Sequence, residues 1–111
     1  MGERGVIELR TDDKMVCIYT HGYGHKMEQL VANALNSEGA RNRYDDPCYL
    51  TKIIFCSLLH QTGSDLLGEH GWGLSPDAEI DTNYPNVVVN LDSRTVNGLS
   101  YKVFIERTLA K

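Results

Sequence analysis

The chain has 111 residues, of which 41% are hydrophobic and 23% are charged, and its formal net charge is −4. A chain of this length can bury enough apolar surface to fold alone, so we expect a single domain over residues 1–111. Because acidic residues outnumber basic ones, the chain has no overall positive field to attract bulk nucleic acid. Its apolar runs are too short to span a membrane. No secretory signal is recognised at its start, so we expect a cytoplasmic globular protein without membrane contact.

The first two elements are predicted to form a β-hairpin. GVIELR (5–10) and MVCIYTH (15–21) are rich in β-branched and aromatic residues, and the TDDK between them is typical of a turn. Alternation along the second strand places Cys17, Tyr19 and His21 on one side. An exposed Cys17 beside His21 would be a candidate nucleophile, whereas a buried thiol with a surface histidine is the simpler interpretation.

The sequence His-Gly-Tyr-Gly-His (21–25) lies between this hairpin and the next helical pattern. Its two histidines have the spacing of a helical metal site, but the intervening glycines disfavour a helix there. A zinc site would need further ligands through tertiary contact, from among Asp45, His60, His70 and Asp92. We therefore expect neither a metal site nor another cofactor.

Two helices are predicted in the middle of the chain. From Lys26 the apolar residues recur at helical spacing, and Gly39 is a suitable stop for this first helix. The second helix begins with Asp46 as N-cap and Pro47 at the first helical position, and it ends at Gly63.

The second predicted helix is apolar around most of its circumference. Such a helix is either the central core helix or buries a second face against another subunit, so we expect a homo-oligomer. Cys48 and Cys56 lie within it and, like Cys17, form no C-x-x-C pair. We predict that all three cysteines are unpaired, buried thiols.

The last third of the chain is predicted to contain a long connection and two strands. Residues 62–85 carry glycines, prolines and turn formers, and long ordered loops in small domains are usually functional. NVVVNLD (86–92) and YKVFIE (101–106) have the composition of strands, the second with alternating apolar residues. The order β-β-α-α-β-β predicts an α+β fold, an antiparallel sheet of about four strands with two helices packed on one face.

Polar and aromatic residues flank the predicted helix starts and strand ends. Backbone N–H groups and arginines there favour a phosphate, aromatic rings stack on bases, and an aspartate accepts from a base or ribose. We predict a nucleotide-like ligand without catalytic residues, in which the arginines bind phosphate, Tyr23 and Trp72 stack, and the histidines donate hydrogen bonds. The predicted ligand-binding residues are His21, Tyr23, His25, Arg41, Arg43, Tyr44, Asp45, Trp72 and Arg94.

Several motifs resemble a group of small, mostly uncharacterised phage and prophage proteins. These motifs are MGERGVIEL, IYTHGYGH, RYDDPCYLTKIIFCSLL, GWGLSP and NVVVNLDSRTV. Members of that group open with an M-G-x-R-G strand and have a Y-x-H turn and an Asp-Asp-Pro-x-Tyr helix start. The chain departs from the pattern at Gly22 and Tyr23, where an aromatic residue followed by glycine is expected. The resemblance implies a viral or prophage origin and a cytoplasmic setting in a bacterial cell, but no activity.

Small phage proteins of this kind often act against host defence. We therefore expect a non-enzymatic, homo-oligomeric protein that sequesters a small phosphorylated, nucleotide-like signal. One alternative is an inhibitor that occludes a host defence protein by direct contact through its acidic surface. Another is a small hydrolase that uses His21, His25 and an aspartate.

Overall fold

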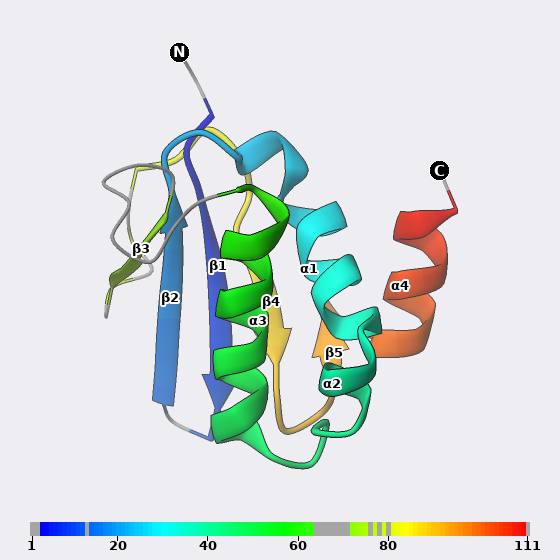
Figure 1. Ribbon diagram of the computed structural model, residues 1–111. Coiled ribbons are helices and arrows are strands. Elements are labelled where there is room, and N and C mark those ends of the chain that lie inside the picture. The colour runs from blue at the N-terminus through cyan, green and yellow to red at the C-terminus, as the bar shows by residue number, and fades with distance from the viewer. Residues whose placement is uncertain are drawn as a thin grey trace.

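The computed structural model describes residues 3–12, 14–63, 72–75, 77, 79 and 81–110. The described residues form an α+β fold in which helices cover one face of a mixed sheet (Figure 1). In chain order the strands are β1 (Gly5–Thr11), β2 (Lys14–Thr20), β3 (Trp72–Ser75), β4 (Val87–Asn90), β5 (Thr95–Val96) and β6 (Leu99–Ser100). The helices are η1 (Gly24–Lys26, a 3-10 turn), α1 (Met27–Asn36), α2 (Glu38–Arg41), α3 (Pro47–Gln61) and α4 (Tyr101–Leu109).

The sheet has six strands in the order β3-β2-β1-β4-β5-β6. The predicted hairpin is confirmed, since β1 and β2 pair antiparallel along their whole length. The prediction of a purely antiparallel sheet of about four strands is wrong, because β1 and β4 pair in parallel. A parallel neighbour requires a crossover, which the chain between β2 and β4 supplies.

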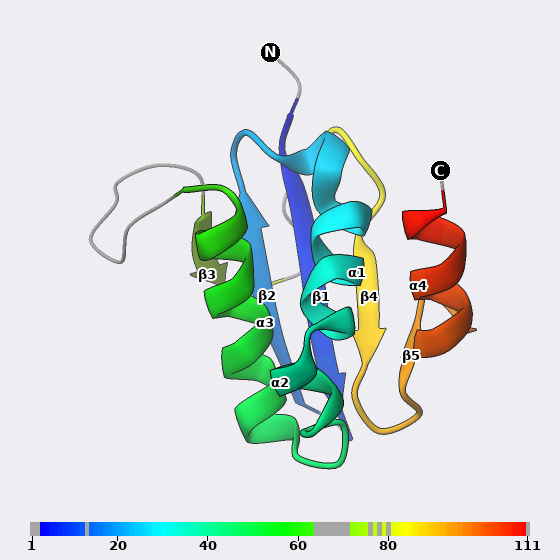
Figure 2. The same cartoon turned by 45° about the vertical axis from the view of Figure 1, so that its right-hand side comes forward.

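The first two predicted helices are confirmed, but the predicted stop of the first helix at Gly39 is wrong, because α1 ends at Asn36 and Gly39 lies within α2. The apolar stripe of α1 is buried against the sheet, and Asp46 caps α3 by accepting from the Tyr49 N–H at 3.3 Å. Figures 1 and 2 show α1 and α3 side by side over one face of the sheet. None of the described helices is long and apolar enough to cross a membrane.

The predicted strand 101–106 is wrong, because this segment forms helix α4. The Ser100 side chain caps the helix by accepting from the Val103 N–H at 3.2 Å. Tyr101 and Phe104 are buried one turn apart, so the apolar residues follow a helical period as well as an alternation. Packing against α1 decides between the two periods, since α4 lies beside α1 at the β5 side of the sheet (Figure 2).

The prediction of three buried cysteines is correct only for Cys17. Helix α3 buries one stripe, represented by Leu50 and Ile54, and leaves Cys48 and Cys56 exposed on its opposite side. The predicted all-round apolar surface of α3 is therefore only partly buried within this chain, with Tyr49 exposed beside the two cysteines. The three cysteines are free thiols.

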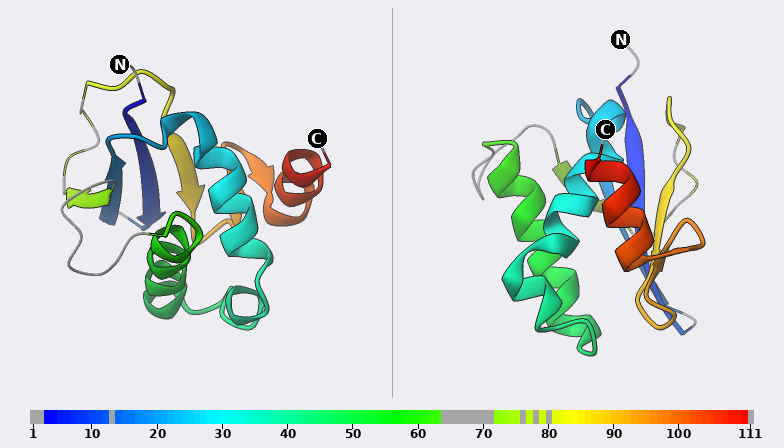
Figure 3. Two further views of the ribbon diagram at one scale, coloured as in Figure 1. Left: turned by 45° about the horizontal axis from the view of Figure 1, so that its top comes forward. Right: turned by 90° about the vertical axis from the view of Figure 1, so that its right-hand side faces the viewer.

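Residues 81–86, which lead into β4, lie on the face of the sheet opposite the helices, as the right-hand view of Figure 3 shows. Beneath them Glu8 is buried, pairing with Arg10 at 2.5 Å and accepting from the Asn86 amide at 2.8 Å. Cys17 lies directly across from Glu8 on β2. Burial, reinforced by the charges of Glu8 and Asp77, raises the pKa of the Cys17 thiol, which is therefore a poor nucleophile.

Candidate functional site

The nine predicted ligand-binding residues fall into two groups at opposite ends of α3. Tyr23 Oη donates to the Thr62 carbonyl at 3.5 Å, and Trp72 Nε1 donates to Thr62 Oγ1 at 3.0 Å, just after α3 ends. Arg43 instead pairs with Asp46 at 3.7 Å, where α3 begins. A helix of 15 residues is about 22 Å long. A single small ligand in one chain therefore cannot contact both groups.

Tyr23 and Trp72 stack on each other rather than standing free. Their ring centroids are 5.6 Å apart and the rings are tilted by only 7°. Both rings are half-buried against the core, where they cover the carboxyl end of α3. Their predicted stacking on a ligand is untested, and a base would have to displace this contact to lie between them.

His21 and His25 take different partners. His21 is exposed, with Nδ1 3.3 Å from Tyr19 Oη, whereas His25 Nδ1 lies 2.5 Å from Glu3 Oε1. His70 lies outside the described residues. Among the residues that are described, no group of three or more His, Cys, Asp or Glu side chains could hold a metal ion.

Gly24 allows two segments to approach closely at the start of the helical layer. Its N–H donates to the Glu3 carbonyl at 2.8 Å. A Cβ at this position would lie 2.6 Å from the Tyr84 ring and 2.7 Å from the Glu3 carbonyl oxygen. By contrast, a Cβ on Gly22 would meet no atom within 4 Å. Of these two glycines in the 21–25 segment, only Gly24 is required by packing.

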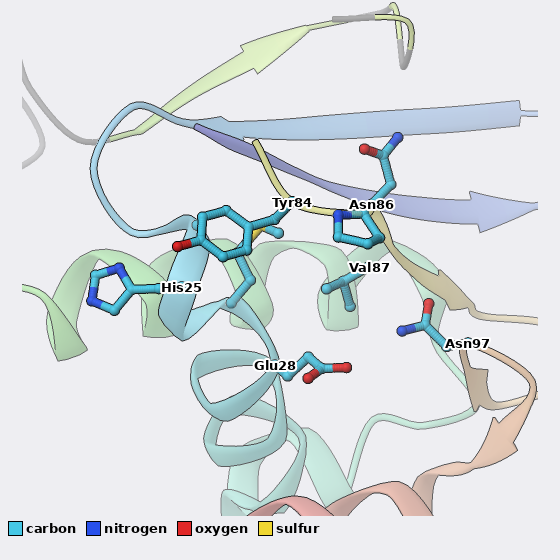
Figure 4. Close-up of a pocket in the computed structure, with 9 residues that line it drawn as sticks. His25, Glu28, Tyr84, Asn86, Val87 and Asn97 are labelled. Carbon is cyan, nitrogen blue, oxygen red and sulfur yellow. The ribbon is translucent and has the colours of Figure 1, made fainter. Parts of the chain in front are cut away.

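A pocket of about 320 Å³ opens beside Gly24, between the start of α1 and the start of β4 (Figure 4). The β5–β6 turn closes its far side. It is lined by Gly24, His25, Met27, Glu28, Tyr84, Pro85, Asn86, Val87 and Asn97. Of these residues only His25 was predicted from the sequence.

The polar groups of the pocket are separated along its length. Figure 4 shows His25 at one end and Glu28 and Asn97 at the other, with the Tyr84 ring and Val87 between them. The Asn86 amide points away from this space and donates to Glu8. One end of the pocket thus presents a carboxylate and an amide, and the other end presents an imidazole.

Glu3 holds His25 and Tyr84 in place at the imidazole end. Its Oε1 atom contacts His25 Nδ1 and accepts from Tyr84 Oη at 3.1 Å. Burial, together with the hydrogen bond to Glu3 and its charge, raises the pKa of Tyr84, so this hydroxyl remains a donor. Because Nδ1 faces Glu3, Nε2 is the imidazole nitrogen left for a ligand.

The sequence contained two signals for the pocket residues that were missed. Tyr84 and Pro85 end the long connection just before β4, where a loop residue can be held over a site. Asn97 and Gly98 form the turn between β5 and β6, with φ of +50° and +86°. An Asn-Gly pair is a strong hairpin signal. Glu28 carries no such signal, because it follows the pattern of an ordinary exposed helix residue.

The second group of predicted residues packs at the amino end of α3. The Arg43 guanidinium lies over the Tyr49 ring at 4.8 Å, and Tyr44 Oη donates to the Leu35 carbonyl at 2.7 Å. Asp45 is exposed in the connection from α2 to α3. The β4–β5 connection, which contains Arg94, lies at this same end of the molecule (Figure 1).

Arg41 and Tyr44 also line a second cleft, of about 300 Å³, beside α4. Its other lining residues are Asn36, Lys102, Ile105 and Glu106. All four charged or amide side chains of this cleft belong to exposed residues. The cleft is thus a surface feature in which charges of both signs are mixed. In the first pocket, by contrast, the carboxylate and the imidazole lie at different ends.

An apolar groove of about 370 Å³ lies between α3 and the β2–β3 side of the sheet. It is lined by Val16, Ile18, Cys48, Thr51, Lys52, Phe55 and Leu74. Leu74 is 62% exposed and Val16 is 40% exposed, and the other large apolar residue found exposed in the described part, Tyr49, follows Cys48 on α3. Exposed apolar side chains that gather in one place indicate an interaction surface.

Comparison of the chain with protein-family models, with curated proteins and with solved structures gave no significant match. The relationship to phage proteins therefore stays a prediction from the sequence.

Proposed function

We propose that the protein binds and sequesters a small nucleotide-like ligand in the pocket between the start of α1 and the start of β4. The order of groups along the pocket supports this proposal most directly. A carboxylate and an amide at one end suit a base edge, and the Tyr84 ring suits its flat face. His25 at the other end suits a phosphate.

The size of the pocket limits the ligand. Small-molecule sites have volumes of about 300–1,000 Å³, and the 320 Å³ of this pocket lies at the small end of that range. We therefore propose that one base with its sugar occupies the pocket, and that the phosphate extends past His25 toward solvent. A cyclic dinucleotide would place only one of its two halves inside.

We propose binding without turnover, because the groups around the pocket are suited to recognition. The thiol of Cys17 is buried and does not line the pocket, and its raised pKa makes it a weak nucleophile. The competing hydrolase hypothesis would use His25, oriented by Glu3, as a general base for water. Recovery of the intact compound after denaturing a loaded sample distinguishes the two hypotheses.

We propose further that sequestration counters host defence in the cytoplasm of a bacterial cell. This part of the proposal rests on the sequence motifs that resemble small phage proteins. A protein that binds a nucleotide second messenger without converting it lowers the free concentration of that signal, provided that the protein is present in stoichiometric amounts.

Calorimetry with nucleoside monophosphates and cyclic dinucleotides tests the binding proposal. His25→Ala should weaken binding by about 3- to 10-fold, because a partly exposed hydrogen bond to a charged phosphate is lost. Arg41→Ala, at the other end of the molecule, is the matched control and should bind within about 2-fold of the wild type. Absence of binding by every nucleotide, or a larger effect of Arg41→Ala than of His25→Ala, would contradict the proposal.

A second candidate function, contact with another protein, is supported by the apolar groove. We propose a second copy of this chain as the partner, since β3 is the edge strand of the described sheet and its residue Leu74 lines the groove. A twofold axis would place the same edge and the same apolar residues against each other. Light scattering should show a wild-type dimer that Leu74→Asp dissociates and the exposed α1 variant Gln29→Asp does not. A monomeric wild type at all concentrations excludes this assembly.

A further inference from the structure

We infer that the Glu28 and Asn97 end of the pocket selects guanine over the other bases. This inference rests on the proposed function of the same pocket and names the base that it binds. It depends on which hydrogen-bonding atoms at this end are already occupied and which remain for a ligand.

Asn97 offers a donor in a fixed position. Its backbone N–H donates to the Val88 carbonyl at 2.8 Å, and its side-chain Oδ1 accepts from the Val88 N–H, also at 2.8 Å. These two bonds to one residue hold Asn97 and use its side-chain acceptor. The amide nitrogen remains, and it lies on the side that faces Glu28 in Figure 4. Asn97 therefore presents N–H groups to the pocket.

Glu28 offers acceptors only. Its carboxylate extends from the first turn of α1 toward the same end of the pocket as the Asn97 amide (Figure 4). Within the described part of the chain, the carboxylate of Glu28 has no hydrogen bond or ion pair. A carboxylate that can accept two hydrogen bonds thus lies beside an amide nitrogen that donates.

The Watson–Crick edge of guanine is complementary to this pair of side chains. Its N1–H and N2–H₂ groups are adjacent donors for the carboxylate of Glu28, and its O6 atom accepts from the Asn97 amide. Adenine would direct the lone pair of N1 at the carboxylate, and cytosine would do the same with N3. Uracil has one N–H between two carbonyl groups, so it offers the carboxylate a single donor.

Calorimetry with the 5′-monophosphates of guanosine, inosine, adenosine, cytidine and uridine tests the inference. Wild-type protein should bind the guanosine compound about 10-fold or more tightly than the adenosine compound, as expected for a bidentate contact. Inosine monophosphate lacks the N2 amine and should fall between them. Equal or tighter binding of adenosine monophosphate overturns the inference and leaves the proposed function standing. Absence of binding by all five compounds overturns the inference, and absence of binding by cyclic dinucleotides as well overturns the proposed function.

Two substitutions assign the selectivity to these side chains. Glu28→Gln replaces one acceptor by a donor, so the preference for guanosine over adenosine monophosphate should fall by about 10-fold. Asn97→Asp keeps the acceptor for the Val88 N–H and tolerates the positive φ, but removes the donor to O6, so it should weaken guanosine monophosphate binding. Glu106→Gln on α4 is the matched control and should leave the preference unchanged. An unchanged preference in folded Glu28→Gln protein, verified by its melting temperature, overturns the inference.

Discussion

The amino end of α3 and the first pocket both gather aromatic and charged side chains but use them differently. At the amino end the arginine and tyrosine side chains contact one another and the backbone: Arg43 lies over Tyr49, and Tyr44 packs edge-on against Tyr101. In the first pocket, between the starts of α1 and β4, the polar groups are held at the borders, and the Glu28 carboxylate has no hydrogen bond or ion pair to a described residue. Aromatic and charged residues therefore indicate a ligand site only where packing leaves their polar atoms unoccupied.

The largest effect on stability is expected at the pocket end, for Gly24. Gly24→Ala places a Cβ against the Tyr84 ring and the Glu3 carbonyl, and overpacking of this kind costs about 1–3 kcal/mol of unfolding free energy. Gly22→Ala, two residues earlier, is the control and should change stability by less than about 0.5 kcal/mol. Chemical denaturation measures both. Equal losses in the two variants would show that flexibility of the segment, rather than close approach at Gly24, requires these glycines.

At the amino end of α3, two tyrosines in contact should respond in opposite ways to removal of their hydroxyl groups. Tyr44→Phe loses the hydrogen bond to the Leu35 carbonyl and should destabilise the protein by about 1–2 kcal/mol. The Tyr101 hydroxyl is buried without a hydrogen-bond partner in the described residues, and burial raises its pKa to about 12. Tyr101→Phe should therefore leave stability unchanged or raise it slightly. A loss for Tyr101→Phe as large as that for Tyr44→Phe would contradict this assignment.

A smaller and pH-dependent effect is expected from Asp92, at the same end. Its carboxylate accepts from the Asp12 N–H at 2.5 Å and from Thr11 Oγ1 at 2.9 Å, and these bonds, the first most strongly, lower its pKa from the ordinary 3.8. A lowered pKa in the folded state stabilises the protein above pH 3.8, and this contribution is lost as the pH falls through the folded-state pKa. Asp92→Asn should therefore be less stable than the wild type at pH 7.

Urea titrations at a series of pH values measure this effect. The difference in unfolding free energy between wild type and Asp92→Asn should shrink as the pH falls below 3.8. A difference that stays constant with pH would assign the effect to altered hydrogen bonding alone. No comparable loss is expected for Asp45→Asn, since Asp45 is exposed and has no ion pair or hydrogen bond among the described residues.

Only part of the candidate site was predictable from the sequence. The 21–25 segment was recognised, and its His25 does line the pocket, because a turn between a strand and a helix has a local signature. Glu28, Tyr84 and Asn97 were missed, since they come from three distant segments and each has an ordinary local role. The arginines were assigned to the same ligand as the histidines, although α3 separates the two groups by its length.

The sequence by itself determined the elements whose signals are local. The β1–β2 hairpin follows from alternation around a turn, α1 from its apolar spacing, and α3 from Asp46 and Pro47 at its start. In each case residues that are neighbours in the chain specify the structure, so no distant partner is needed.

Only the tertiary structure decided the parallel pairing of β4 with β1, the helical state of α4 and the position of the pocket. Tyr101, Val103 and Ile105 alternate as in a strand, whereas Tyr101 and Phe104 are one helical turn apart, and contact with α1 selects the helix. The pocket exists because the chain crosses the sheet before β4 and brings Tyr84 against Gly24. Such contacts depend on the path of the whole chain, and the free energy of packing distant segments outweighs local preference.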